Sequence, residues 1–382
     1  MYKIATLNSI SQKGLALFSD KYELTNETST ASGILVRSAG LHDMEFGGGL
    51  LAIARAGAGF NNIPIPKCSE EGVVVFNTPG ANANAVKELV ISSLIIASRN
   101  IPGAIEWAKT IRQNVFEEVE KNKKMFVGEE IRRKTLGVIG LGYIGVMVAN
   151  AAEGLGMKVV GYDPYISLKN AHDLSASVRV YETLQAMLPH CDFVTVHVPA
   201  NDETAGMIDY GLINAMKNRA VLLNFSRDKL VNMDDLKKAL NERKLRMYIT
   251  DFPTDELIGV GGTILIPHLG ASTKESEENC AIMAAEQMID YLENGNITNS
   301  VNYPAINIGD KKNGVRVVIL HRNVPAMLSK ITSALSGTNI DNLINKSRGD
   351  YACTAMDLDD FDPKKVNGAL DIEGIIKIRF IE

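Results

Sequence analysis

Three side chains that suit chemistry on a hydroxyl group follow separate predicted β-strands in the second half of the chain: Arg227, Glu256 and His268. A hydride can leave the carbon of an alcohol only when a base removes the hydroxyl proton, and imidazole titrates near neutral pH. A neighbouring carboxylate would orient the imidazole and stabilise its cation. The planar guanidinium of arginine binds carboxylate and carbonyl oxygens. The three residues therefore predict chemistry on a 2-hydroxy acid, with His268 as the base.

A glycine-rich turn earlier in the chain has the pattern of a dinucleotide site. The segment 140–145 reads Gly-Leu-Gly-Tyr-Ile-Gly, between a predicted strand and a predicted helix. Gly140 allows a tight turn, Gly142 lets the backbone approach a pyrophosphate, and Gly145 permits close packing of helix on strand. Asp163 follows the next strand, 163 − 145 = 18 residues after the last glycine, where an acid hydrogen-bonds the adenosine ribose. Because a carboxylate there repels a 2′-phosphate, we expect NAD rather than NADP.

Short runs of β-branched residues recur over the first 300 residues, most of them separated by segments long enough for a helix. The predicted strands are 4–7, 33–37, 73–77, 135–139, 159–162, 193–198, 221–225, 248–251 and 264–266. Strands that alternate with helices predict βαβ units, buried parallel sheets and an α/β fold. Ligands of such a sheet bind at the carboxyl ends of the strands, which is where Arg227, Glu256 and His268 stand.

Three further segments of the sequence indicate how the chain is divided into domains. Residues 98–135 form a long polar, helix-like stretch, which predicts a crossing between domains. Residues 272–294 predict one long helix, opened by the capping-box pair Ser272 and Glu275. After a linker at 299–313, the predicted order is strand 315–320, helix from Pro325, strand near Ile340, strand 352–358, helix from Pro363 and strand 375–381. This βαββαβ order is typical of a small ferredoxin-like module.

Composition excludes several classes of protein. The 382 residues exceed one ordinary domain, and 40 Lys and Arg against 45 Asp and Glu give a formal charge of −5, so we expect no nucleic-acid partner. The longest apolar run, 89–97, is interrupted by Ser92 and Ser93 and is far shorter than a membrane span, and no signal peptide is evident. We therefore expect no membrane partner and a cytoplasmic location. Cysteines at 68, 191, 280 and 353 have no metal-binding spacing, so no metal is expected.

Together these motifs resemble the D-isomer-specific 2-hydroxyacid dehydrogenases over essentially the whole chain. The segments that carry the resemblance are 140–145, 197–199, 224–227, 251–256 and 267–273. The resemblance implies a Rossmann-type NAD domain at 99–270, inserted in a flavodoxin-like substrate domain formed by 1–98 and 271–300. It further implies that the module at 314–382 is an ACT-like regulatory domain. A small-molecule substrate and a homodimer or homotetramer are expected.

The resemblance also implies roles for individual residues. Arg227 would bind substrate, while Glu256 and His268 would form the acid/base pair. Expected cofactor contacts are Gly140, Gly142, Tyr143, Ile144, Gly145, Asp163, Val198, Pro199, Thr204, Phe225, Ser226, Asp251 and Gly270. Expected substrate-binding residues are Arg37, Ser38, Arg55 and Gly57, and the two arginines would contact the phosphate and the carboxylate. The implied reaction is oxidation of 3-phospho-D-glycerate by NAD to 3-phosphohydroxypyruvate, the first step of L-serine synthesis.

Some positions depart from the family pattern, and alternatives stay open. Tyr143 replaces a basic residue, which removes one expected pyrophosphate contact, and Leu257 after Glu256 leaves Asp255 as an alternative partner of the base. A glyoxylate or hydroxypyruvate reductase and an NAD-sensing corepressor are the competing functions. In the C-terminal module the resemblance implies a serine site at His321, Asn323 and Asn339.

Overall fold

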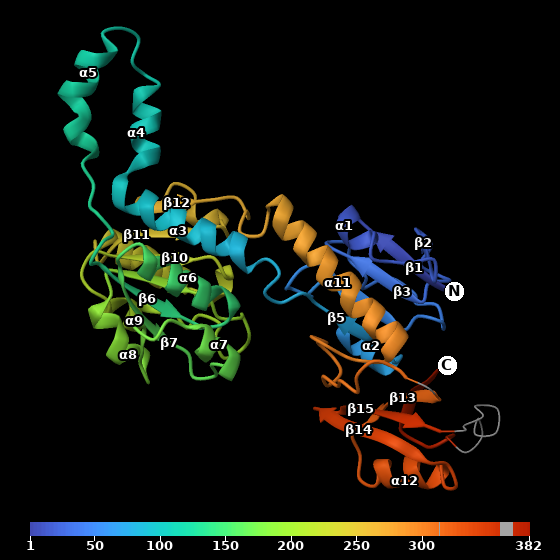
Figure 1. The fold of residues 1–382 in the computed structure, drawn as a ribbon. Coiled ribbons are helices and arrows are strands. Elements are labelled where there is room, and N and C mark those ends of the chain that lie inside the picture. The colour runs from blue at the N-terminus through green and yellow to red at the C-terminus, as the bar shows by residue number, and fades with distance from the viewer. Residues whose placement is uncertain (313, 360–369) are drawn as a thin grey trace. The chain divides into compact units, whose positions relative to one another are not determined.

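The computed structural model describes residues 1–312, 314–359 and 370–382, and it divides the chain into two compact units (Figure 1). The first unit contains residues 1–82 and 274–382, and the second contains residues 83–273. The first boundary lies earlier than the predicted crossing near residue 98, because helix α3 (Ala83–Arg99) belongs to the core of the second unit. Its residues Val86, Val90 and Leu94 are buried there. The three predicted domain extents themselves stay predictions.

The second unit is built on a seven-stranded sheet whose neighbouring strands are all parallel, in the order β12-β11-β10-β9-β6-β7-β8. Its strands are β6 (Thr135–Ile139), β7 (Lys158–Tyr162), β8 (Arg179–Val180), β9 (Phe193–Val196), β10 (Ala220–Asn224), β11 (Leu245–Thr250) and β12 (Thr263–Leu265). Buried side chains of the sheet and of its helices form two hydrophobic clusters. The strand order reverses beside β6, and a crevice at such a point is where doubly wound sheets bind dinucleotides.

Helices of the second unit connect these strands, and two of them project from it. They are α4 (Ile101–Ala108), α5 (Val115–Asn122), α6 (Tyr143–Gly154), α7 (Leu168–Asp173), α8 (Leu184–Met187), α9 (Tyr210–Ala215) and α10 (Met233–Asn241). Figure 1 shows α4 and α5 extending away from the seven-stranded sheet. Within the described part of the chain, no single helix is long and apolar enough to cross a membrane. The pair α3 and α4 passes that test together but bends by 66° at its junction.

The first unit contains a five-stranded parallel sheet in the order β2-β1-β3-β4-β5, the order of a flavodoxin-like fold. Its strands are β1 (Tyr2–Leu7), β2 (Tyr22–Thr25), β3 (Gly33–Val36), β4 (Ala52–Arg55) and β5 (Val74–Phe76). Its helices are α1 (Gln12–Leu15), α2 (Ile65–Glu70) and the long α11 (Lys274–Asn294). The predicted α/β class is confirmed. Strands β2 and β4 were not predicted, and Arg55 is the last residue of β4.

A four-stranded antiparallel sheet completes the first unit, in the order β14-β15-β13-β16. Its elements are β13 (Val315–Arg322), α12 (Met327–Ala334), β14 (Ile340–Arg348), β15 (Tyr351–Leu358) and β16 (Ile375–Ile381). This strand order agrees with the predicted ferredoxin-like module. The helix predicted from Pro363 lies outside the described residues.

The antiparallel sheet buries side chains on both of its faces. Val317 and Ile319 of β13 pack with α12, while the alternate residues Val318 and Leu320 join the cluster that contains Met288 and Tyr291 of α11. Successive strand residues point to opposite faces, so the two clusters lie on the two sides of one strand. The C-terminal module therefore shares a hydrophobic core with the five-stranded sheet and α11.

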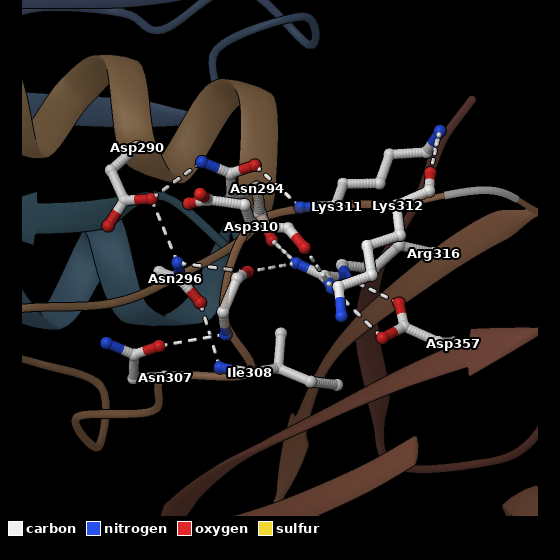
Figure 2. Close-up of polar contacts among 11 residues, drawn as sticks. Asp290, Asn294, Asn296, Asn307, Ile308, Asp310, Lys311, Lys312, Arg316 and Asp357 are labelled. Atoms are coloured by element: carbon white, nitrogen blue, oxygen red, sulfur yellow. Dashed lines mark hydrogen bonds and ion pairs between the residues drawn. The ribbon is translucent and has the colours of Figure 1, made fainter. Parts of the chain in front are cut away.

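A buried arginine reinforces this contact (Figure 2). The side chain of Arg316 is 1% exposed, and its guanidinium donates to both carboxylate oxygens of Asp357 at 2.6 and 3.0 Å. Its Nη1 also donates to the carbonyl oxygens of Asn294, at the end of α11, and of Gly309, at 2.8 and 2.6 Å. One side chain thus ties the antiparallel sheet, the linker and α11 together.

A second arginine of the module binds the same end of α11. Arg379 of β16 donates to the carbonyl oxygens of Tyr291 and Leu292 at 3.1 and 3.0 Å. The last carbonyl groups of a helix have no partner inside the helix and carry partial negative charge. Arg316 and Arg379 therefore cap α11 from the C-terminal module.

Candidate active site and cofactor site

The glycine-rich turn after β6 has an open cradle at its centre. A Cβ atom at Gly140, where φ is +92°, would lie 2.7 Å from the carbonyl oxygen of His197, and one at Gly145 would lie 1.9 Å from that of Gly140. Both positions therefore require glycine. A Cβ atom at Gly142 would meet nothing within 4 Å. The space in front of the first turn of α6 fits a pyrophosphate held by backbone N–H groups.

The carboxylate of Asp163 is held beside this turn. One oxygen accepts from the backbone N–H of Leu141 at 2.8 Å, and the other accepts from that of Tyr165 at 2.8 Å. Each carboxylate oxygen can accept more than one hydrogen bond, so both keep capacity for ribose hydroxyl groups. The predicted ribose-binding acid thus lies next to the predicted phosphate cradle.

Two loops at the carboxyl ends of β9 and β10 contain further predicted cofactor contacts. The hydroxyl of Ser226 donates to the carbonyl oxygen of Val198 at 2.9 Å, which joins the two loops. Within the first loop, the hydroxyl of Thr204 donates to the carbonyl oxygen of Pro199 at 2.6 Å. Phe225, before Ser226, is buried. These residues therefore share one edge of the seven-stranded sheet with the end of β6, as its topology requires.

An aromatic ring brings two of the predicted catalytic residues together. The ring of Phe252 lies 4.5 Å from that of His268, and the guanidinium carbon of Arg227 lies 5.4 Å from the Phe252 ring. Both His268 and Arg227 are exposed, so each can reach a substrate. Phe252 was not predicted as a site residue. Its only signal in the sequence is a large aromatic residue next to Asp251, at a strand end.

Asp251 is buried beneath this group. One carboxylate oxygen accepts from the backbone N–H of Gly270 at 2.8 Å. Burial raises the pKa of Asp251, and the positive charges of His268 and Arg227 lower it. Asp251 therefore lies within electrostatic reach of both side chains and fixes the backbone of the loop that follows His268.

Glu256 has a different partner from the predicted one. Its carboxylate accepts from Lys237 of α10 at 3.0 Å, and its side chain is 58% exposed. The adjacent Asp255 is also exposed. The role of either carboxylate as the partner of His268 stays a prediction.

Substitution of Glu256 by glutamine is expected to move the acid limb of the pH profile of kcat/KM to lower pH, because the imidazolium loses its counter-charge. The profile is recorded beside that of Asp255→Asn, which removes one charge at the neighbouring position. A shift seen only in Asp255→Asn would assign the role to Asp255.

His197 has to be distinguished from His268, since both follow strands of the same sheet. The Nε2 atom of His197 lies 2.9 Å from the hydroxyl of Thr195, and its Nδ1 atom is buried. Burial lowers the pKa of His197 to about 3. A neutral imidazole that does not take up a proton near neutral pH is unsuited to be the base. The role of the exposed His268 as the base stays a prediction.

The predicted phosphate and carboxylate contacts lie in the first unit, after β3 and at the end of β4. Arg37 forms an ion pair of 2.8 Å with Glu277 in the first turn of α11. A Cβ atom at Gly57 would lie 2.0 Å from the Nη1 atom of Arg55, so this glycine leaves room for the arginine. Burial raises the pKa of Cys280 on α11, and the positive charges of Arg55 and Arg37 lower it. Both arginines therefore lie within electrostatic reach of Cys280, in the N-terminal half of α11.

Ser38 contributes its backbone to the same region. Its N–H donates to the side-chain oxygen of Asn8 at 2.9 Å. This contact fixes the loop after β3, from which Arg37 projects.

The predicted serine-binding residues of the C-terminal module do not meet within one chain. His321 is buried, and its Nε2 atom lies 2.9 Å from the hydroxyl of Thr354. It pairs with Ala352 at one end of β15, whereas the side chain of Asn339 donates to Asp359, beyond the other end. Asn323 donates to a backbone carbonyl in the turn before β15. A serine site there stays a prediction and would need residues from two copies.

No cluster of three His, Cys, Asp or Glu residues suited to a metal ion occurs within 1–312, 314–359 and 370–382.

Comparisons with known proteins agree with this geometry. Residues 91–270 match the family described as D-isomer specific 2-hydroxyacid dehydrogenase, NAD binding domain. A Saccharomyces cerevisiae protein named D-3-phosphoglycerate dehydrogenase 1 is 31% identical over 333 residues, which cover 81% of this chain and 68% of the relative. The chain belongs to the D-isomer-specific 2-hydroxyacid dehydrogenase family. The predicted family and the predicted NAD cofactor are thereby confirmed.

Other members of this 2-hydroxyacid dehydrogenase family show the same likeness. A Synechocystis protein named D-3-phosphoglycerate dehydrogenase is 30% identical over 372 residues, and the match spans 92% of this chain and 64% of that relative. A crystal structure of NAD⁺-bound 3-phosphoglycerate dehydrogenase from Entamoeba histolytica superposes with a TM-score of 0.63 at 29% identity, covering 79% of this chain and 98% of the other.

Proposed function

We propose that this chain oxidises 3-phospho-D-glycerate to 3-phosphohydroxypyruvate with NAD, the first step of L-serine synthesis. The choice of substrate is supported by Arg37 and Arg55. Their two guanidinium groups suit a molecule with both a phosphate and a carboxylate. The relatives named D-3-phosphoglycerate dehydrogenase support the same substrate.

Exposed side chains of the second unit have separate roles in the proposed reaction. NAD, bound at the Gly140–Gly145 turn, supplies the acceptor for the hydride. His268 removes the proton of the C2 hydroxyl, and the positive charge that it gains is stabilised by a nearby carboxylate. Arg227 binds the substrate carboxylate and the developing carbonyl oxygen, and Phe252 holds the two side chains at their spacing.

Substitution of Asp163 by alanine tests the choice of cofactor. It is expected to raise KM for NAD and to reduce the preference for NAD over NADP, because it removes both the ribose acceptor and the charge that repels a 2′-phosphate. The measurement is kcat/KM for each cofactor in the wild type and the variant. A ratio unchanged by the substitution would place the discrimination at another residue.

The function itself is tested by NADH formation at alkaline pH with phosphoglycerate, glycerate and lactate measured side by side. We expect kcat/KM for phosphoglycerate to exceed that for glycerate by at least about tenfold. Only phosphoglycerate has a phosphate that can accept hydrogen bonds from an arginine, and hydrogen bonds between charged groups are stronger than those between neutral ones. A preference for glycerate would favour the reductase. No turnover of any of the three acids, with NADH still bound, would favour the corepressor.

The proposal extends to assembly and location. A homodimer or homotetramer is supported by the α4 and α5 region, where Phe116 and Val127 are 79% and 78% exposed, since large exposed apolar side chains mark interaction surfaces. Sedimentation velocity would measure the assembly. A cytoplasmic location is supported by Cys68, Cys191, Cys280 and Cys353, which are all buried free thiols, as in a reducing compartment.

A further inference from the structure

The segment that follows β7 is held against α6 at two places. At its start, Asp163 accepts from the N–H of Leu141 in the glycine-rich turn. At its end, the side chain of Asn150 on α6 donates to the carbonyl oxygen of Asp173 at 2.8 Å and accepts from the N–H of Ser175 at 2.9 Å. Helix α7, which lies between these contacts, therefore has a fixed position beside α6.

A lysine of α7 lies near the ring of the residue that begins α6. The Nζ atom of Lys169 lies 5.5 Å from the centroid of the Tyr143 ring. Tyr143 is the first residue of α6, directly after Gly142, and it is 44% exposed. An ammonium over an aromatic face is attracted by the negative charge of that face. The positive charge of Lys169 is thus attracted to the ring of Tyr143, the residue that follows the open position Gly142.

The glycine-rich turn lacks a cation of its own. The side chains of residues 140–145 are uncharged, and Asp163 adds a negative charge beside them. A pyrophosphate brings about two more negative charges, which backbone N–H groups and the partial charge of a helix end offset only in part. We propose that Lys169 binds the pyrophosphate of the dinucleotide and that Tyr143 positions its ammonium group. This proposal rests on the assignment of the turn as the NAD site.

The test measures NADH binding to the ligand-free protein by fluorescence. Lys169→Met is expected to raise the dissociation constant about three- to tenfold at low salt, the range of one partly exposed charge pair. Lys169→Arg keeps the charge and should restore most of the affinity. Lys158→Met is the matched control, because Lys158 is exposed and lies at the opposite end of β7. It should bind NADH like the wild type.

Two further ligands locate the contact. ADP-ribose contains the pyrophosphate, so Lys169→Met should weaken its binding as much as that of NADH, whereas adenosine should bind both proteins equally. The difference should shrink in about 0.5 M salt, where exposed charges are screened. The proposal for Lys169 would be overturned if Lys169→Met and Lys158→Met bound NADH equally well, or if Lys169→Met lost as much affinity for adenosine as for NADH. Either result would leave the proposed function intact. A wild type that does not bind NADH would overturn the proposed function as well.

Discussion

Alanine in place of His268 is expected to lower kcat by a factor of a hundred or more while NADH binds nearly as tightly as before. General acid/base catalysis contributes about 10²- to 10⁴-fold, and the exposed imidazole of His268 is the group placed to supply it beside Phe252 and Arg227. His197 cannot take over, since burial lowers its pKa to about 3. Binding should persist because the glycine-rich turn and Asp163 do not depend on His268.

Steady-state kinetics with a saturating substrate would measure the loss, and NADH fluorescence would measure the binding. His190→Ala is the control, because His190 is exposed in the same unit and has no assigned role. If His268→Ala retained more than about a tenth of the wild-type kcat, another residue would have to be the base.

The second large effect concerns stability. Arg316→Met is expected to lower the free energy of unfolding of the first unit by about 3 kcal/mol, because breaking a buried ion pair leaves an uncompensated charge. The substitution leaves the carboxylate of Asp357 without its ion-pair partner. It also removes the hydrogen bonds of Arg316 to the carbonyl oxygen of Asn294, at the end of α11, and to that of Gly309, in the linker. Denaturant unfolding followed by a signal from the first unit would measure the change.

Two comparisons make this result interpretable. Lys3→Met breaks an exposed ion pair with Glu23 in the same unit and should cost less than about 0.5 kcal/mol. Adding Asp357→Leu to Arg316→Met removes the stranded charge and should recover part of the loss. Equal stabilities of Arg316→Met and Lys3→Met would contradict the view that the C-terminal module caps α11.

Sequence patterns were sufficient where local chemistry decides the structure. Strands rich in Val and Ile were predicted from their β-branched runs, and the G-x-G-x-x-G turn was found because its glycines satisfy local steric demands. Strand β4 was missed because its residues Ala52–Arg55 include two alanines of low strand propensity, and the burial that stabilises it comes from its neighbours. Strand β2 was missed because Glu23 and Leu24 are exposed at the sheet edge.

Contacts between distant segments could not be predicted in the same way. The first predicted domain extends to residue 98, whereas the apolar face of helix α3 packs in the second unit. The capping of α11 by Arg316 and Arg379 joins residues that local periodicity cannot relate. At the candidate site, Phe252, the ion pair of Arg37 with Glu277 and the contact of Glu256 with Lys237 likewise depend on tertiary packing.

Transfer of an isotope from the substrate to the cofactor tests the proposed reaction most directly. The protein would be incubated with NAD and 3-phospho-D-glycerate that carries deuterium at C2, and the products would be analysed by mass spectrometry. We expect deuterium in the NADH formed, together with an equal amount of 3-phosphohydroxypyruvate. Phosphoglycerate recovered with its deuterium intact and no NADH formed, from a protein shown to bind NADH, would contradict the proposed function.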